Sequence, residues 1–220
     1  MDIEEFEARF YRQPAEAYLR ASLGASAEAS LHDLIAEASE RNLRLQRFKR
    51  SAILPRVARV LGFLQGVRPN NLLDIGTGRG VFLWPLLDAW PTLPVHCLDL
   101  LDHRVEMLNR VREGGIDNLS AEIRDIGEEG WQPEPFDIVT ALEVLEHIPD
   151  PQRAIAQCVR HATRYVVASC PSKEDDNPEH LHLFTSGELE QRFLDAGAER
   201  AHTEYVLNHQ IVFATVGSSC

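Results

Sequence analysis

Hydrophobic positions recur with two different periods along the 220 residues of the chain. In the first part, apolar residues return every three or four positions, a spacing that is typical of amphipathic helices. It predicts helices over residues 4–23, broken near Pro14, and over residues 30–50 and 51–65. We therefore expect residues 1–66 to form a helical N-terminal cap or lid.

From Asn71 onward, short apolar runs alternate with amphipathic segments. The runs predict strands over residues 72–75, 95–98, 119–124, 136–142, 165–170, 199–206 and 210–216. The segments between them predict helices over residues 81–89, 102–113, 151–161 and 186–196. The last two strands are joined only by residues 207–209, a link that permits an antiparallel hairpin but no crossover helix. The expected fold is α/β, a doubly wound Rossmann-like sheet of seven strands with an antiparallel last strand, over residues 67–220.

A glycine-rich turn directly follows the first predicted strand and contains Gly76, Gly78 and Gly80. Glycine lets the backbone turn sharply and lets a ligand approach without a Cβ in the way. The amides at the start of the next helix can then meet a carboxylate or a phosphate. Because the turn lies between a strand and a helix, it predicts a cofactor-binding loop.

Two acidic residues end the next two predicted strands. Asp99 lies about twenty residues beyond the glycines, where an acid is placed to bind the two hydroxyls of a ribose. Its alternative role is to cap the following helix, for which Asp102 is better placed. Asp125 ends the third strand, where it can accept a hydrogen bond from an adenine amino group, or act as a plain turn residue.

These motifs, in this order and followed by the segment EVLEH from Glu143 to His147, resemble the class I S-adenosylmethionine-dependent methyltransferase family. The resemblance covers roughly residues 72–216 and implies S-adenosylmethionine as the cofactor. The residues that it assigns to the cofactor are Asp74, Gly76, Thr77, Gly78, Gly80, Asp99, Leu100, Asp125, Ile126 and Glu143. The alternative, a nicotinamide dehydrogenase, has a GxGxxG loop, whereas the third glycine here comes one residue earlier.

A sulfonium methyl group is already activated, so the enzyme mainly aligns a nucleophile and removes a proton. The candidate residues follow the fourth and fifth strands, whose carboxyl ends meet at one edge of a parallel sheet. We expect Glu146, His147 and His182 to be catalytic, with Asp175, Asp176, Glu179 and His180 in the same loops. Each of these residues alone is also compatible with a role in a turn or a loop.

The segment EVLEH followed by a later histidine resembles two metal-assisted branches of the family, the ubiquinone-pathway catechol O-methyltransferases and the small-RNA 3′-end 2′-O-methyltransferases. It implies a divalent metal (Mg, Mn, Fe or Zn) bound by Glu143, Glu146, His147 and His182. The spacing i, i+3, i+4 would place the first three on one face of a helical turn, and either His180 or His182 could complete the site. The alternative is His147 acting as a general base through a water, without a metal.

The formal charge of −12 argues against a long phosphate-binding surface, so we do not expect nucleic acid as a partner. A local exception is the stretch from Arg41 to Val60, which has seven basic residues and no acidic one. It predicts either a solvated face or a surface for an anionic partner.

No apolar run of transmembrane length occurs, and the acidic N-terminus is unlike a secretion signal, so we expect a cytoplasmic protein. The four cysteines, Cys97, Cys158, Cys170 and Cys220, are expected to be reduced. The expected function is S-adenosylmethionine-dependent O-methylation of a small molecule. The alternatives are an RNA 2′-O-methyltransferase and a non-catalytic S-adenosylmethionine-binding partner protein.

Overall fold

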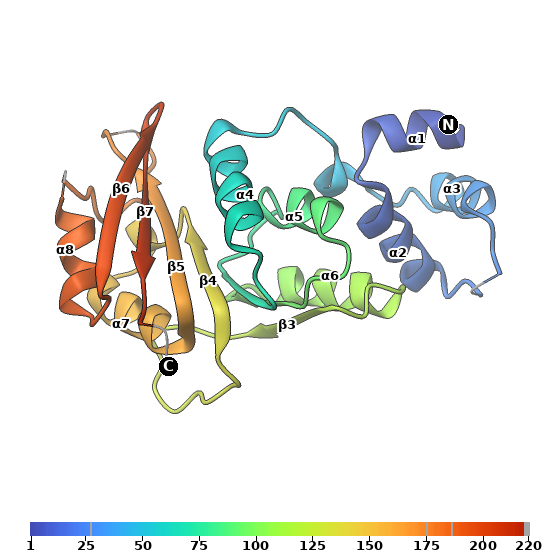
Figure 1. The fold of residues 1–220 in the computed structure, drawn as a ribbon. Helices are drawn as coiled ribbons and strands as arrows, with labels where there is room; N and C mark the ends of the chain where they lie inside the picture. Colours follow the sequence, from blue (N-terminus) through green and yellow to red (C-terminus); the bar gives the residue numbers. More distant parts are fainter. Residues whose placement is uncertain (27, 175, 186, 218–220) are drawn as a thin grey trace. The chain divides into compact units, whose positions relative to one another are not determined.

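The structure, a computed structural model, describes residues 1–26, 28–174, 176–185 and 187–217 (Figure 1). The chain divides into two compact units. Unit 1 comprises residues 1–53 and 77–123, and unit 2 comprises residues 54–76 and 124–220. Among the described residues, the structure contains no helix with the length and apolar character needed to cross a membrane.

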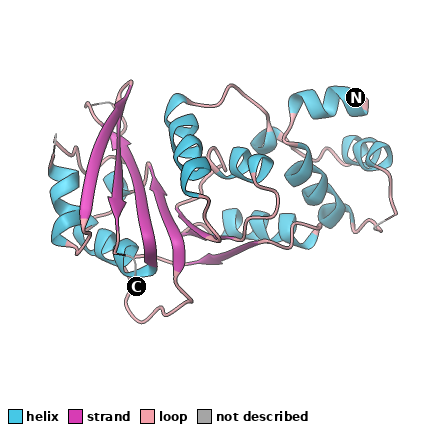
Figure 2. Cartoon of the chain, viewed as in Figure 1, coloured by secondary structure: helices cyan, strands magenta, loops and turns pink. Residues whose placement is uncertain are grey.

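Unit 1 is mostly helical, as Figure 2 shows by colour. Its elements are α1 (Ile3–Arg9), α2 (Arg12–Leu23), α3 (Leu31–Glu40), the 3-10 turn η1 (Gln46–Phe48), α5 (Leu83–Ala89), β2 (Val95–Asp99), α6 (Asp102–Glu113) and β3 (Leu119–Ile123). The strands β2 and β3 pair in parallel, with Val95 opposite Leu119. The helix α6 has the predicted bounds, and its buried Val105, Leu108 and Val111 recur at the helical spacing that predicted it.

The three helix predictions in the N-terminal region differ from the structure at their boundaries, and the helix predicted over residues 51–65 spans Pro55–Val67. The first break lies at Phe10 and Tyr11, whereas Pro14 is in the first turn of α2, where a missing N–H costs nothing. The long helix predicted over residues 30–50 ends at Glu40, and Asn42 has a φ of 54°. The chain instead returns to the end of α1, because Tyr11 donates its backbone N–H to the carbonyl oxygen of Phe48 at 2.9 Å.

Aromatic side chains hold this return in place. Phe48 is fully buried, and its ring lies 5.3 Å from that of Tyr18 and 5.1 Å from that of Trp84. Arg50 forms two hydrogen bonds with Asp88, at 3.0 and 3.1 Å. The N-terminal helices therefore share a core with residues 77–123, which sequence periodicity did not indicate. Whether residues 1–66 act as a lid stays a prediction.

Unit 2 contains a five-stranded sheet in the order β1-β4-β5-β7-β6. Its elements are α4 (Pro55–Val67), β1 (Leu72–Ile75), β4 (Phe136–Leu142), η2 (Leu145–His147), α7 (Pro151–His161), β5 (Ala162–Pro171), α8 (Glu188–Asp195), β6 (Arg200–Val206) and β7 (His209–Thr215). The strand β4 is parallel to β1 and β5, whereas β7 is antiparallel to β5 and β6. Figure 1 shows α4 on one side of this sheet and α7 and α8 on the other.

The two units together contain the seven predicted strands, and the last strand is antiparallel. The α/β fold class is therefore confirmed. Three of the four cysteines, Cys97, Cys158 and Cys170, are buried and free, and Cys220 lies outside the described residues.

Candidate active site

The glycine loop begins where β1 ends. Gly76, Gly78 and Gly80 have φ values of 66°, 61° and 79°. A Cβ on Gly76 would lie 2.6 Å from a methyl carbon of Val144, so the loop that follows β4 packs directly against the first glycine. Asp74 is buried at 3% exposure and accepts a hydrogen bond from Thr140 Oγ1 at 2.7 Å, which joins the end of β1 to β4.

Asp99 contacts the start of the following helix, close to the capping role that its position in the sequence allowed as an alternative, whereas Asp102 is the first residue of α6 and does not cap it. Asp99 is 4% exposed, and its Oδ2 accepts a hydrogen bond from the backbone N–H of Gly78 at 2.9 Å. Oδ1 accepts from the N–H of Leu101 at 3.0 Å, and Arg104 lies 3.3 Å from Oδ2. The carboxylate thus ties the glycine loop to the start of α6, while Leu100 is 63% exposed. A contact of Asp99 with ribose stays a prediction.

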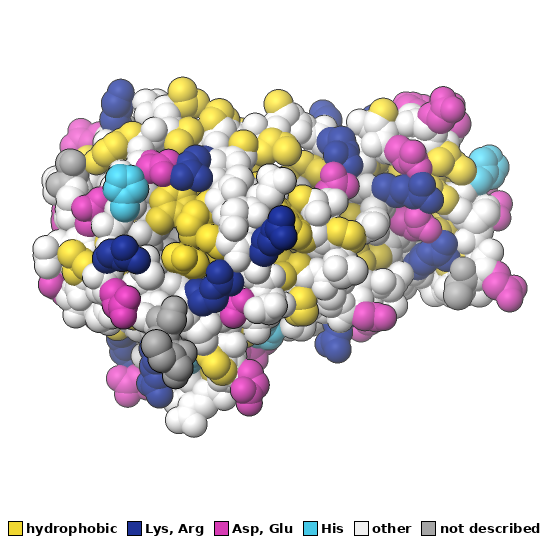
Figure 3. Space-filling model, in the orientation of Figure 1, with side chains coloured by type: hydrophobic (Ala, Val, Ile, Leu, Met, Phe, Trp, Pro, Cys, Tyr) yellow, Lys and Arg dark blue, Asp and Glu magenta, His cyan; other side chains and the backbone are white. Residues whose placement is uncertain are grey.

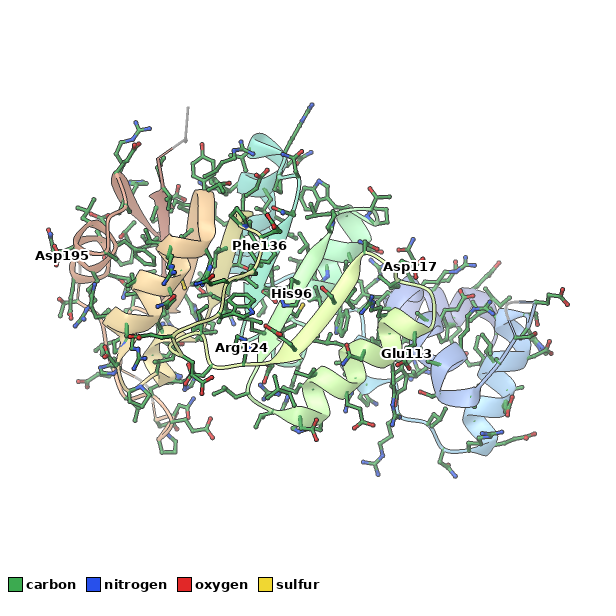
Figure 4. All side chains as sticks on the ribbon, turned by 90° about the horizontal axis from the view of Figure 1, so that it is seen from below. His96, Glu113, Asp117, Arg124, Phe136 and Asp195 are labelled. Atoms are coloured by element: carbon green, nitrogen blue, oxygen red, sulfur yellow. The ribbon has the colours of Figure 1, made fainter. Side chains whose placement is uncertain are left out.

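Asp125 lies in the turn after β3. Its side chain is exposed, and Oδ1 accepts a hydrogen bond from the N–H of Gly127 at 2.8 Å. Asp125 therefore acts as a turn residue, and its contact with adenine stays a prediction. Ile126 is buried at 4% exposure. Figure 4 shows Arg124 in the same segment, where its guanidinium lies 5.5 Å from the centre of the Trp131 ring.

Glu143 is the first residue after β4 and has a φ of 58°. Its carboxylate accepts a hydrogen bond from Ser169 Oγ at 2.7 Å and lies 3.1 Å from Nε2 of His209. The Nε of Arg56, on α4, lies 3.7 Å from the carboxylate. The carboxylate of Glu143 is therefore contacted by side chains of α4, β5 and β7, and the sequence motifs indicated none of these contacts.

Glu146, His147 and His180 form a group of metal-binding character. One ligand atom from each lies within 4.8 Å of the others. Glu146 is fully buried beside the thiol of Cys170, and neither of its carboxylate oxygens has a hydrogen bond of normal geometry among the described residues. Burial raises the pKa of Glu146 to about 8, and the charge of Glu143 adds to this rise. A cation beside this carboxylate would offset the cost of its burial.

The geometry of His147 fits the same interpretation, whereas Nε2 of His180 lies 3.0 Å from the side-chain amide nitrogen of Asn177. His147 Nδ1 donates to the carbonyl oxygen of Glu179 at 2.9 Å, which leaves the lone pair on Nε2. Histidines that bind metals commonly donate their second ring nitrogen in this way. The ring centres of His147 and His180 are 4.8 Å apart.

Two of the four predicted metal ligands make other contacts. Glu143 lies outside η2, so Glu143, Glu146 and His147 do not share one helical turn. His182 Nε2 donates to the carbonyl oxygen of Ile148 at 3.0 Å, and its ring stacks on Phe184. The structure therefore brings His180, rather than His182, to Glu146 and His147. Asp175 lies outside the described residues.

The basic stretch of residues 41–60 is largely paired with acids. Four of its seven basic residues, Arg41, Arg50, Arg56 and Arg59, lie within ion-pair distance of Glu37, Asp88, Glu143 and Glu204, respectively. This pairing favours the interpretation as a charge-compensated surface over a site for a polyanion.

A separate hydrophobic hollow lies on unit 2 and is visible in Figure 3. It has a volume of about 630 Å³, and Phe63, Tyr165 and Phe213 line it together with Arg200 and His202. Tyr165 is at the amino-terminal half of β5, whereas the acidic and histidine side chains follow the carboxyl ends of β4 and β5. The hollow is thus distinct from the candidate active site.

The chain is similar in sequence to known methyltransferases. Residues 73–164 match a family described as a methyltransferase domain. The ubiquinone biosynthesis O-methyltransferase of Pseudomonas fluorescens is 32% identical over 98 residues, which cover 43% of this chain and 40% of that protein. The protein of the same name from Vibrio atlanticus is 32% identical over 102 residues, covering 45% and 41%. The chain thus spans about two fifths of the length of these relatives.

Solved structures share the fold. An O-methyltransferase family protein from Burkholderia thailandensis has a TM-score of 0.61 at 16% identity, covering 86% of this chain and 60% of that one. The N-terminal domain of EvdMO1, determined in the presence of SAH and D-fucose, has a TM-score of 0.61 at 15% identity, covering 88% and 99%. The methyltransferase domain of bacterial CtHen1 has a TM-score of 0.62 at 19% identity, covering 73% and 98%.

Motifs, fold and comparisons agree. The match of residues 73–164 to a methyltransferase domain and the similarity to O-methyltransferases support the resemblance to S-adenosylmethionine-dependent methyltransferases that the sequence motifs predicted.

Proposed function

We propose that this protein transfers the methyl group of S-adenosylmethionine to an oxygen atom of a small-molecule acceptor. The observation that carries the proposal is the group of Glu146, His147 and His180 that follows the carboxyl ends of β4 and β5. Ligands bind at this edge in open α/β sheets. The named O-methyltransferases among the relatives support oxygen as the acceptor atom.

For the cofactor, we propose the residues that the family resemblance assigns. The loop from Gly76 to Gly80 holds the methionine part, and Asp74 supports the loop from its buried position. Asp99 and Leu100 bind the ribose, and Asp125 and Ile126 flank the adenine. The cofactor supplies an activated methyl group on a sulfonium, so the chain has to orient the acceptor and exclude water.

We also propose a divalent cation bound by Glu146, His147 and His180, with His180 in the place that sequence reasoning gave to His182. A mixed set of one carboxylate and two imidazoles suits Mg²⁺, Mn²⁺, Fe²⁺ or Zn²⁺. Such a cation supplies Lewis acidity, which lowers the pKa of an acceptor hydroxyl. The test is activity after exhaustive chelation, followed by the addition of each cation separately. Full activity without any metal, with a large loss in His147→Ala, would instead establish His147 as a metal-free base.

The function itself is tested by incubating the purified protein with S-adenosylmethionine and a panel of catechols, hydroxy acids and short RNAs. We expect a mass gain of one methylene unit on a hydroxyl compound. A gain on RNA alone, with strongly salt-dependent binding, would favour the RNA 2′-O-methyltransferase. Cofactor binding without turnover of any compound would favour the non-catalytic binding protein.

We propose a cytoplasmic location, which the three free cysteines of the described residues support.

A further inference from the structure

The carboxylate of Glu143 is the meeting point of three elements of unit 2. Ser169 from β5 contacts Oε1 at 2.7 Å, and Arg56 from α4 lies 3.7 Å from the same oxygen. His209 from β7 contacts Oε2 at 3.1 Å. The side chains of Arg56, Glu143 and His209 are 22%, 23% and 25% exposed, so the group is largely buried but still in contact with solvent.

Sheet register explains why these residues meet. Ser169 pairs with Ile211, and Pro171 pairs with His209, so Ser169 and His209 project from the same face of the sheet. The helix α4 carries Arg56, Arg59 and Phe63 at the spacing i, i+3, i+7, which places them along one helical stripe. Phe63 lies 4.7 Å from the ring of Phe213, and Arg59 binds Glu204, so this stripe lies against that face.

Glu143 adopts a backbone conformation that is costly for its residue type. A left-handed φ is unfavourable for a residue with a Cβ, and Glu143 has a φ of 58°. Its N–H donates to the carbonyl oxygen of Ser169 at 2.8 Å, so backbone and side chain are both anchored to β5. Strained residues of this kind are concentrated at active sites, where the surrounding structure holds them.

The carboxylate of Glu143 bears on the tautomer of His209. Nε2 lies 3.1 Å from Oε2 of Glu143, and because an ionised carboxylate only accepts hydrogen bonds, this contact favours the tautomer of a neutral His209 that carries the hydrogen on Nε2. Nδ1 is then the nitrogen with the lone pair. Among the described residues, no side chain or backbone group donates a hydrogen bond to Nδ1 of His209. This nitrogen is suited to accept a hydrogen bond from a hydroxyl group.

His209 also lies at the edge where the acceptor is expected. Its partner Pro171 is the last residue of β5. Val144, which follows Glu143, packs against Gly76 of the cofactor loop. The ring is therefore held at the carboxyl edge of the sheet, next to the segment that begins at the first glycine.

We propose that His209 binds the acceptor: its Nδ1 accepts the hydrogen bond of the acceptor hydroxyl, and Glu143 is a positioning residue that fixes the ring. The inference rests on the proposed function and specifies one residue of its substrate site. It requires an acceptor that presents a hydroxyl as a hydrogen-bond donor, such as a phenol or a catechol.

The test uses the full chain and compares His209→Gln with His209→Asn and the wild type. In His209→Gln the amide nitrogen can replace Nε2 toward Glu143, but no lone pair remains at the position of Nδ1. In His209→Asn the amide oxygen can replace Nδ1, while the contact with Glu143 is lost. His202→Gln, on the exposed surface of β6, is the matched control.

Four quantities are measured for each protein: KM and kcat for catechol and 3,4-dihydroxybenzoate, the Kd of catechol for the complex with S-adenosylhomocysteine, and the Kd of S-adenosylhomocysteine itself. For His209→Gln we expect KM and the catechol Kd to rise by about ten-fold, as for one lost hydrogen bond. The affinity for S-adenosylhomocysteine should change by less than about two-fold, because the cofactor loop is untouched. His209→Asn should recover part of the acceptor affinity, and His202→Gln should match the wild type.

Wild-type acceptor affinity in both His209 variants would overturn the inference and leave the proposed function standing. Equal losses of acceptor and S-adenosylhomocysteine affinity would also overturn it, because they would show a structural role. A wild-type protein that binds S-adenosylhomocysteine but neither binds nor methylates any hydroxyl probe would overturn the proposed function, and with it the inference.

Discussion

Gly114 ends α6 at a point where this helix touches the backbone of α2. A Cβ on Gly114 would lie 1.8 Å from the carbonyl oxygen of Ala17 and 2.4 Å from its carbonyl carbon. The φ of Gly114 is −81°, a value that alanine adopts readily. Substitution of Gly114 by alanine therefore tests the contact between the two helices without adding backbone strain.

We expect Gly114→Ala to destabilise the protein. The atoms that the new methyl group would meet belong to a backbone, which cannot move away by a rotamer change, so one helix has to shift. Overpacking of this kind costs about 1–3 kcal/mol, and occasionally more. For a chain of this length, that corresponds to a fall in Tm of roughly 2–12 °C.

Gly62→Ala is the matched control, because Gly62 lies within α4 and an added Cβ would meet nothing within 4 Å. Replacing a helical glycine by alanine should raise stability by about 0.5–1 kcal/mol. Both variants are compared with the wild type by urea unfolding followed by circular dichroism. Equal stability of Gly114→Ala and wild type, with the expected gain in Gly62→Ala, would show that α2 is not packed on α6 as described.

Three further predictions concern the active site and the N-terminal helices. Asp99→Ala should abolish measurable cofactor binding in calorimetry and also lower stability, because charge-assisted hydrogen bonds of about 1.5–3 kcal/mol each are lost. In the presence of a chelator, the free energy of unfolding of the wild type should fall by about 2.5 kcal/mol between pH 5 and pH 7, relative to that of Glu146→Gln. The pKa of Glu146 is raised in the folded state, so protonation of Glu146 stabilises the fold, and this stabilisation is lost as the pH rises toward about 8. Parallel curves of unfolding free energy against pH for the two proteins would contradict the prediction. Deletion of residues 1–50 should unfold unit 1, because it removes the Phe48 ring that packs on Trp84. A truncated protein that stays folded and binds the cofactor, but turns over its substrate slowly, would instead support the lid.

The periodicity of the sequence determined most of the fold. The bounds of α6, α7 and β4 agree with the prediction, because each combines a regular apolar pattern with a local end signal such as Pro151 or Gly114. The cofactor loop was also predictable, since strand, glycines and helix are contiguous in the chain.

Only the tertiary structure decided where the N-terminal helices break and which side chains meet at the site. The helix over residues 30–50 was predicted from its apolar spacing, but burial of Phe48 against Tyr18 and Trp84 outweighs local propensity there. His180 and His182 are both compatible with the sequence pattern, and only the fold of the loop places His180 beside Glu146. His209 is 66 residues from Glu143 and belongs to no motif. Its place was fixed by the antiparallel register of β7 on β5, because a shift of one residue would turn its side chain to the opposite face of the sheet.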